Sequence, residues 1–153
     1  MIVDAVSIQL YLRGIVLDFI KDNCPNGLWL YNPSKFGGES IPVHFITENT
    51  QGNSHKNGIL IAEHFEELQE NAYTDFIASG ALYYLEFMDD RGTGLRLKRF
   101  IQELQRMFEH GVHDVSDEVA IDITSVNKAE FESEADDSKI HMIMRVSANV
   151  FAK

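Results

Sequence analysis

The chain has one cysteine, Cys24, and too few basic residues to balance its acids. Against 24 Asp and Glu it has 13 Lys and Arg among 153 residues, so its formal net charge is −11. A single cysteine excludes an intrachain disulfide and the zinc modules built on several cysteines. The acidic balance disfavours nucleic-acid binding and docking on anionic membranes, because both need a basic surface. The sequence also lacks a run of 18 apolar residues and a basic N-terminal segment, which predicts neither a membrane span nor a signal peptide.

The composition is that of a folded globular protein. Hydrophobic residues make up 44% of the chain and charged residues 24%, a balance typical of soluble domains and not of disordered segments. A domain of this size buries roughly 68–70% of the surface of its unfolded chain. Because the sequence contains neither an internal repeat nor an interdomain linker, we expect a single domain over residues 1–153.

Two segments have the apolar periodicity of amphipathic helices. The first spans Asp4–Asn23, with Asp4 placed to cap its N-terminus and Pro25 just beyond its end. Its apolar face is wide enough to require a core or a partner. The second spans about Leu95–His110, and Gly111 is expected to stop it. The buried stripe of the second helix is expected to comprise Leu97, Phe100, Ile101, Leu104 and Phe108.

Five segments have the composition or the alternation of strands. They are Leu28–Tyr31, Ile41–Ile46, Ala81–Met88, Val119–Thr124 and Ile140–Val150. The last segment alternates apolar and polar residues along its whole length, which is typical of a half-buried strand. A sixth segment, Ile59–Ser79, fits more than one structure, and we expect a strand that enters at Ile59 and continues in helical or irregular form.

The remaining polar segments are expected to lie at the surface. Residues 47–58 predict an exposed loop, and the acidic residues 130–137 predict the tip of a hairpin. The fold class that follows is α+β. We expect an antiparallel or mixed sheet of about four to six strands, packed with the N-terminal helix and with the second helix near residues 95–110.

Three groups of residues could support catalysis or bind a metal. His110 and His113, followed by Asp114, could ligate zinc if the backbone brought them together. The alternative is structural, because Gly111 interrupts the pair and a histidine in a last helical turn favours the helix C-terminus. Asp89 and Asp90, with Glu86 upstream, could hold magnesium at a strand end, but Asp also suits a strand-to-helix turn.

Cys24 is the third candidate, as a nucleophile. Such a cysteine needs a base and an electropositive setting, and nothing around Cys24 in the sequence supplies them. The sequence also has no phosphate loop, nucleophile elbow or dinucleotide fingerprint. We therefore expect that the protein is not an enzyme and has no cofactor. The minor alternative is a metal-dependent hydrolase that uses His110, His113 and Asp114.

The charge is distributed unevenly along the chain. Five of the 13 Lys and Arg lie between Arg91 and Arg106, where Glu103 can pair with Arg99, and nine acids lie between Asp114 and Asp137. Opposite charges on two lobes allow head-to-tail association of identical copies, which closes into a ring where the rotation permits. The alternative is a solvated helix face beside a solvated hairpin. The candidate interface residues are Arg91, Arg96, Arg99, Arg106, Glu130, Glu132, Glu134, Asp136 and Asp137.

The order of the expected elements resembles a known family. This order is similar to that of the tail-terminator and head–tail joining proteins of tailed bacteriophages. It consists of an N-terminal helix, a short hairpin (GLWLYNPSKFGGESIPVHFI), a long loop, a strand–helix unit (ALYYLEFMDDRGTGLRLKRFIQELQRMFEHG) and a terminal hairpin. The resemblance implies a hexameric ring that caps the tail tube, ends its polymerisation and joins it to the head connector. It also implies a virion protein of the tail or neck, assembled in the host cytoplasm, with DNA passing through the ring.

A second function class fits the acidic composition. Toxin-immunity and anti-restriction proteins are small α+β monomers whose clustered carboxylates cover a basic surface on their target. The acidic residues from Asp114 to Asp122 and from Glu130 to Asp137 would then form the binding surface. A ring in solution would favour the hypothesis of a phage assembly protein, whereas a strict monomer that binds a basic protein tightly would favour the hypothesis of an inhibitor.

Overall fold

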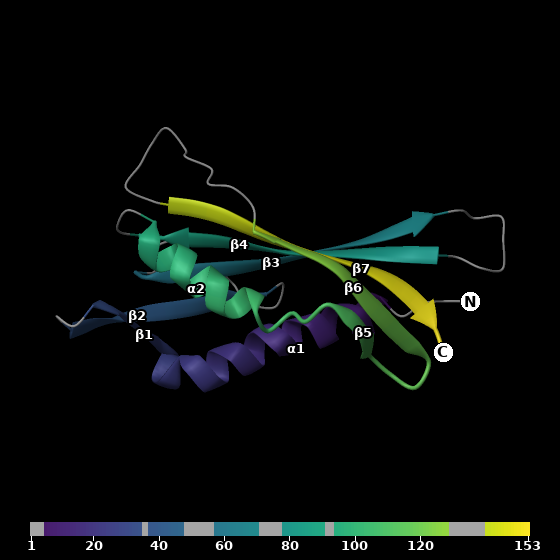
Figure 1. Cartoon of the computed structure of the whole chain (residues 1–153), viewed down its shortest axis with the longest axis horizontal. Coiled ribbons are helices and arrows are strands. Elements are labelled where there is room, and N and C mark those ends of the chain that lie inside the picture. Colours follow the sequence, from purple (N-terminus) through teal and green to yellow (C-terminus); the bar gives the residue numbers. More distant parts are fainter. Residues whose placement is uncertain (1–4, 35–36, 48–56, 71–77, 91–93, 129–139) are drawn as a thin grey trace.

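In the part of the chain that the structure describes, seven strands form one mixed sheet in the order β1-β2-β3-β4-β7-β6-β5, and two helices pack against it (Figure 1). The computed structural model describes residues 5–34, 37–47, 57–70, 78–90, 94–128 and 140–153. Its helices are α1 (Ala5–Asn23) and α2 (Leu95–Gln105), with a short 3-10 turn at Pro25–Gly27. Its strands are β1 (Leu28–Ser34), β2 (Gly37–Ile46), β3 (Ile59–Glu70), β4 (Ala78–Asp89), β5 (Gly111–Asp114), β6 (Val119–Lys128) and β7 (Ile140–Ala152).

Neighbouring strands run antiparallel except at one position. β2 and β3 are parallel, with Val43 opposite Ile59, and their connection is residues 47–58. Gly58 suits the start of β3, because a Cβ at this position would lie 2.2 Å from the carbonyl oxygen of Pro42. The central strands β3, β4 and β7 are paired over most of their lengths, and they form the frame on which the helices sit.

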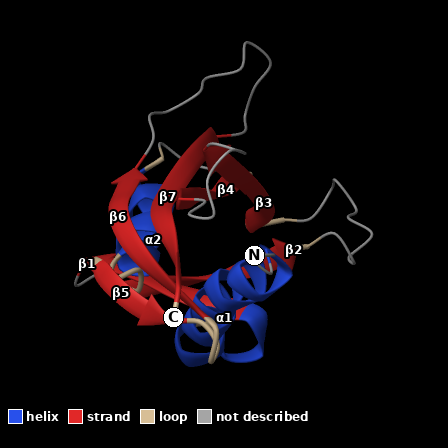
Figure 2. Cartoon of the chain, turned by 90° about the vertical axis from the view of Figure 1, so that its right-hand side faces the viewer, coloured by secondary structure: helices blue, strands red, loops and turns tan. Residues whose placement is uncertain are grey.

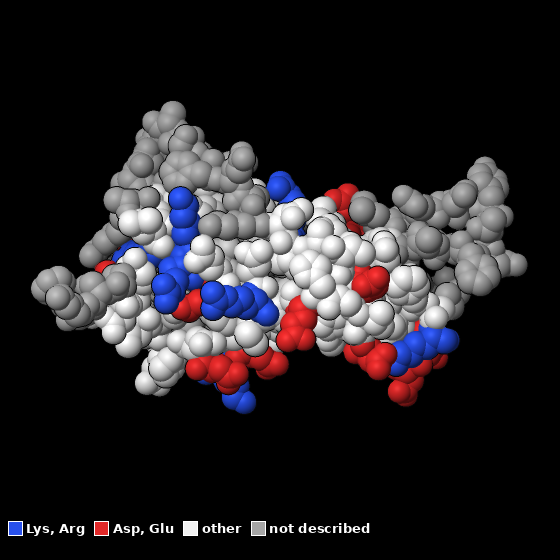
Figure 3. Space-filling model, in the orientation of Figure 1, with Lys and Arg blue, Asp and Glu red and all other residues white. Residues whose placement is uncertain are grey.

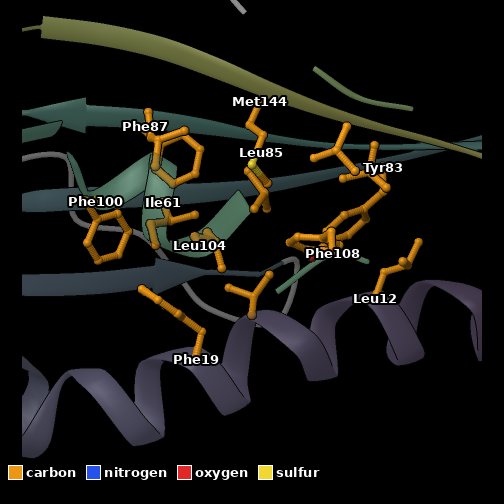
Figure 4. Close-up of a cluster of buried hydrophobic side chains, with 14 of the residues drawn as sticks. Leu12, Phe19, Ile61, Tyr83, Leu85, Phe87, Phe100, Leu104, Phe108 and Met144 are labelled. Atoms are coloured by element: carbon orange, nitrogen blue, oxygen red, sulfur yellow. The ribbon is translucent and has the colours of Figure 1, made fainter. Parts of the chain in front are cut away.

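Both helices lie on the concave side of the curved sheet (Figure 2). The inner side chains of α1, with Leu12 and Phe19 among them, point toward the strands, and Phe100 and Leu104 of α2 meet them there (Figure 4). The ring of Phe100 lies 5.4 Å from Phe19, 5.1 Å from Trp29 and 6.2 Å from Phe87, each in an edge-to-face arrangement. This aromatic cluster joins both helices to the two halves of the sheet.

The structure confirms the α+β class and the first helix, whose buried stripe is Ile8, Leu12, Val16 and Phe19. The expected sheet of four to six strands is too small, since the described residues include seven. The hairpin strands β1 and β2 and the later strands β4, β6 and β7 occur where the sequence predicts them, each somewhat longer than expected. Most of the predicted loop at 47–58 and the whole tip at 130–137 lie outside the described residues.

The expected helical or irregular continuation after Ile59 is wrong as far as Glu70. β3 is a strand of 12 residues and pairs with β4 from Ile59, opposite Asp89, to Glu70, opposite Ala78. The alternation is hard to see in the sequence because Glu63 occupies an inward position, between the buried Ile61 and the partly buried Phe65. A charged residue in the core register hides the period of two.

The second helix is shorter than expected, and a strand follows it. α2 ends at Gln105, and the amide nitrogens of Met107 and Phe108 then bond the carbonyls three residues earlier, at 3.0 and 3.2 Å. This tighter turn keeps Phe108 buried, which explains why the helical periodicity extends past the helix. Gly111, which was expected to stop the helix, instead begins β5 with a φ of 109°.

Within the described ranges, no helix combines the length and apolarity needed to cross a membrane.

Candidate interaction surfaces

Arg96, expected on an exposed basic face, points into the protein. Its guanidinium donates to Asp89 through Nε and Nη2, at 2.6 and 2.5 Å, to Asp90 at 3.1 Å and to Glu39 at 2.9 Å. Arg96 is 7% exposed and Asp89 is 0% exposed. The hydrogen bonds that Arg96 donates to Asp89 raise the pKa of Arg96 above its ordinary value, so its guanidinium stays charged. Arg96 is therefore a fold-stabilising residue and does not contribute to an exposed face.

The acids considered for magnesium are engaged by the same arginine. Asp89 and Asp90 both bind Arg96, and Glu86 lies on the other face of β4 because it is an odd number of residues from Asp89. Arg96, Glu39 and Asp90 line a hollow of about 270 Å³ beside Asn57 and Gly58. The carboxylates outnumber the one arginine, so this hollow does not favour an anion.

The basic surface of α2 consists of the residues that remain outside. Lys98, Arg99 and Arg106 are exposed, and Lys and Arg gather over α2 on the face drawn in Figure 3. Arg99 bonds Glu103 at 3.3 Å, as the spacing predicts, and Glu103 also accepts from the indole nitrogen of Trp29 at 3.1 Å. The remaining basic candidate, Arg91, and the acidic candidates Glu130, Glu132, Glu134, Asp136 and Asp137 lie outside the described residues.

An acidic group lies at the turn between β5 and β6. Asp114, Asp117 and Glu118 are exposed there, and Asp114 pairs with Lys153 at 2.9 Å. The turn is fixed by Ser116, whose hydroxyl oxygen accepts from the amide nitrogens of Glu118 and Val119 at 3.2 Å. Figure 3 shows this group at the end of the molecule far from α2, and further acids over the C-terminal half of α1.

The structure does not bring His110, His113 and Asp114 together as metal ligands. The ring nitrogens of His113 lie 2.7 Å from the Tyr11 hydroxyl and 2.7 Å from the Glu109 carbonyl oxygen. Asp114 follows His113 in β5 and points to the opposite face, and His110 is exposed before the strand. His113 therefore ties β5 to α1, and burial together with Asp114 and Glu109 raises the pKa of Tyr11 at this contact.

A buried ionic network that the sequence did not predict holds α1 on the sheet. Glu63 has a side chain that is 1% exposed, and it accepts from Arg13 at 2.6 Å, from Gln9 at 2.9 Å and from the hydroxyl of Tyr83 at 2.6 Å. Burial by itself would raise the pKa of Glu63, but the bonds from Arg13, Tyr83 and Gln9 hold it below its ordinary value. Burial and the contact with Glu63 raise the pKa of Tyr83.

Two histidines flank a carboxylate on the convex face of the sheet. Glu86 lies 3.1 Å from Nε2 of His64 and 3.4 Å from Nε2 of His141, and the imidazole of His64 stacks on Tyr84 at 4.6 Å. The Nε2 atom of His64 is buried and is not aligned for a hydrogen bond. In the part of the chain that the structure describes, no three His, Cys, Asp or Glu side chains are arranged to hold a metal ion.

Cys24 is buried at the C-terminal end of α1, and burial, followed by the charge of Glu103, raises the pKa of its thiol to about 11. Because the thiolate is the reactive form, we expect the folded protein at pH 8 to react with iodoacetamide about a hundredfold more slowly than an unperturbed cysteine. Mass spectrometry of the alkylated protein, with urea-unfolded protein as the control, measures this. Equal rates in the two states would contradict it.

Among the described residues, large apolar side chains are exposed on α1, on β1, on β5 and β7, and at the two ends of the α2 region, where Leu95 and Met107 are exposed. On α1, spacings of four and seven residues place Val6, Leu10 and Leu17 along the side away from the core. On β1, Leu28 and Leu30 are exposed. On the other side of the sheet order, Val112 of β5 and Phe151 at the C-terminal end of β7 are exposed. Contiguous groups of exposed apolar side chains mark protein–protein contacts, so these groups are the candidate apolar contact surfaces.

Comparisons with known proteins identify a shared fold. No family model and no curated protein matches the sequence. Eleven solved chains match the structure. One of them, a protein whose name is only a sequence identifier, has a TM-score of 0.66, with 15% sequence identity over 97% of this chain and 96% of that chain. At this level of identity the likeness shows the fold alone, a single α+β domain.

Proposed function

We propose that this chain is a structural assembly protein of a tailed-phage virion, which forms a ring that caps the tail tube and joins it to the head connector. The observation that carries the proposal is the separation of charge along the molecule. Exposed Lys98, Arg99 and Arg106 lie on α2, and exposed Asp114, Asp117 and Glu118 lie at the far end (Figure 3). Such polarity supports head-to-tail contacts between copies, which close into rings.

The buried ionisable groups support a structural role. Arg96 with Asp89, and Arg13 with Glu63, form ion pairs that connect separate elements of the fold. Burial also raises the pKa of Cys24, so its thiol is protonated at neutral pH. The two ion pairs hold elements of the domain together, and the exposed chemistry consists of charged faces and apolar groups suited to protein partners.

The exposed apolar residues form several separate surfaces, which is consistent with contacts to more than one partner. A ring subunit needs two surfaces for its neighbours and further surfaces for the tube and the connector. β1 and the C-terminal end of the sheet provide two apolar surfaces, and the outer side of α1 provides a third. We assign the outer side of α1, with Val6, Leu10 and Leu17, to a partner outside the ring.

The ring proposal predicts that charge reversal on α2 blocks assembly. Arg99→Glu with Arg106→Glu is expected to convert a multimer into a monomer, because the basic face would then repel the acidic end of the next copy. Both residues are exposed, so each substitution should lower the free energy of unfolding by no more than about 1 kcal/mol. The larger part is expected at position 99, where a glutamate would replace the ion pair with Glu103 by repulsion. Mass measurement in solution and electron microscopy of purified protein report assembly, and circular dichroism reports the fold.

The control for this experiment is Lys21→Glu, which reverses a charge at an exposed position of α1. This variant is expected to assemble like the wild type. Rings of unchanged mass from the double variant would show that the α2 face is not the subunit interface. A wild-type protein that stays monomeric at high concentration would contradict ring formation itself.

A second candidate function is an acidic inhibitor that binds a basic protein surface. The cluster of Asp114, Asp117 and Glu118 on a rigid turn favours it, because fixed carboxylates can match a basic target. A monomer that binds a basic partner through this turn, and loses binding when Asp117 and Glu118 are changed to lysine, would replace the ring proposal with this one.

A further inference from the structure

One margin of the molecule combines an uncharged edge strand with a basic helix face. β1 ends the sheet, its sequence LWLYNPS has no charged residue, and Leu28 and Leu30 on its outer side are 41% and 60% exposed. On its inner side, Trp29 bonds Glu103, which also binds Arg99. This contact places the basic face of α2 beside β1. We call Leu28, Leu30, Lys98 and Arg99 the basic margin.

The outer face of β5, β6 and β7 combines apolar and acidic side chains. The register places Val112 opposite Asp122, and Asp114 opposite Ala120, which in turn lies opposite Phe151. Val112, Asp114, Asp122 and Phe151 lie on the side of the sheet away from the core, because the alternate positions, such as Ile121 and Val150, are buried. Val112 is 71% exposed. We call Val112, Asp114, Asp122 and Phe151 the acidic face.

The two surfaces complement one another and repel their own kind. Each has two exposed apolar side chains and charges mainly of one sign. The described contacts also give each surface one counter-charge, since Glu103 pairs with Arg99 at the basic margin and Lys153 pairs with Asp114 at the acidic face. Contact between two basic margins, or between two acidic faces, would bring like charges together and is disfavoured. Contact between a basic margin and an acidic face is therefore preferred. Natural edge strands are usually protected by charge, by proline, by a bulge or by a covering element. Pro33 and the irregular register after Tyr31 protect the end of β1, whereas the uncharged first part with Leu28 and Leu30 has no such protection and is expected to be covered.

We infer that the basic margin of one copy binds the acidic face of a second copy of this chain. The inference rests on the proposed ring and assigns its subunit contact to described residues. Every copy has one surface of each kind, so each contact leaves both kinds free at the ends, and the chain of copies continues until it closes. Apolar side chains from β1 would then lie against Val112 and Phe151, with Lys98 and Arg99 near Asp114 and Asp122.

Reciprocal charge reversal tests this contact. One variant carries Lys98→Glu and Arg99→Glu on the basic margin, and the other carries Asp114→Lys and Asp122→Lys on the acidic face. Each variant alone is expected to be monomeric, since both of its surfaces then have the same sign. An equimolar mixture is expected to restore multimers of wild-type mass that contain both variants, because each reversed surface meets its opposite.

Native mass spectrometry, with one variant labelled with ¹⁵N, reports both the mass and the composition of the multimers. Lys21→Glu mixed with Asp22→Lys is the matched control, since both residues are exposed on α1, and each variant alone is expected to assemble. Circular dichroism and thermal unfolding check that all variants fold.

The outcomes separate this contact from the proposed function. Rings that form from either margin or face variant alone overturn the contact and leave the ring proposal standing. A mixture that stays monomeric, although both variants fold, also overturns the contact. A wild-type protein that is monomeric under the same conditions overturns both.

Discussion

Replacing Arg96 with alanine is expected to lower the free energy of unfolding by about 3–5 kcal/mol, which is the typical cost of breaking a buried ion pair. Asp89 is 0% exposed and receives two of the hydrogen bonds of Arg96, so the substitution would leave a carboxylate buried without its counter-ion. The loss would also release Glu39 of β2 from α2. Urea unfolding followed by circular dichroism measures the change.

The neighbouring residue Arg99 provides a matched control. Arg99→Ala removes the same charge from the same helix, but its ion pair with Glu103 is exposed and is expected to contribute about 0.3–0.5 kcal/mol. Arg96→Lys is expected to lie between the two, because it keeps the charge and loses the two-point hydrogen bonding to Asp89. If Arg96→Ala cost no more than Arg99→Ala, the pair with Asp89 would not hold α2 in place.

The elements that could be predicted from the sequence are those whose own residues determine them. The stripe of α1 and the alternation of β7 depend on spacing within a single segment, and both occur as expected. β5 could not be predicted in this way. It has four residues, and its histidine is held by Tyr11, which is more than a hundred residues away in the chain.

The candidate interface could be predicted only in part, because burial of a charged side chain depends on distant partners. Arg96 lies at the edge of the apolar stripe of α2, next to Leu97. The sequence gives no sign of whether it turns outward like Arg99 or inward. Its direction is decided by Asp89 at the end of β4 and by Glu39 on β2, which only the fold brings together. Arg99 and Arg106 turn outward, and the carboxylate that Arg99 meets in the described contacts is the partly exposed Glu103.

Replacing Glu63 with leucine is expected to lower the free energy of unfolding by about 3–5 kcal/mol at pH 7. Arg13, with a side chain 12% exposed, would lose its counter-ion, and the buried hydroxyl of Tyr83 would lose its acceptor. Adding Arg13→Met and Tyr83→Phe to Glu63→Leu removes the stranded groups and is expected to recover most of the loss. Glu66→Leu is the control, since this residue lies on the same strand and is exposed.

Glu63 should also make the stability of the protein depend on pH. Its pKa in the folded state is below its ordinary value, so its ionised form is stabilised by folding. Its contribution is present above the pKa of an unfolded glutamate, about 4.3, and is lost as the pH falls through the lower pKa of the folded state. We expect the wild type to lose stability more steeply below about pH 4.3 than Glu63→Gln, whose side chain cannot be protonated there. Urea unfolding at a series of pH values measures the free energy of unfolding of both proteins. If the two plots of this free energy against pH were parallel, Glu63 would not be a source of the acid sensitivity.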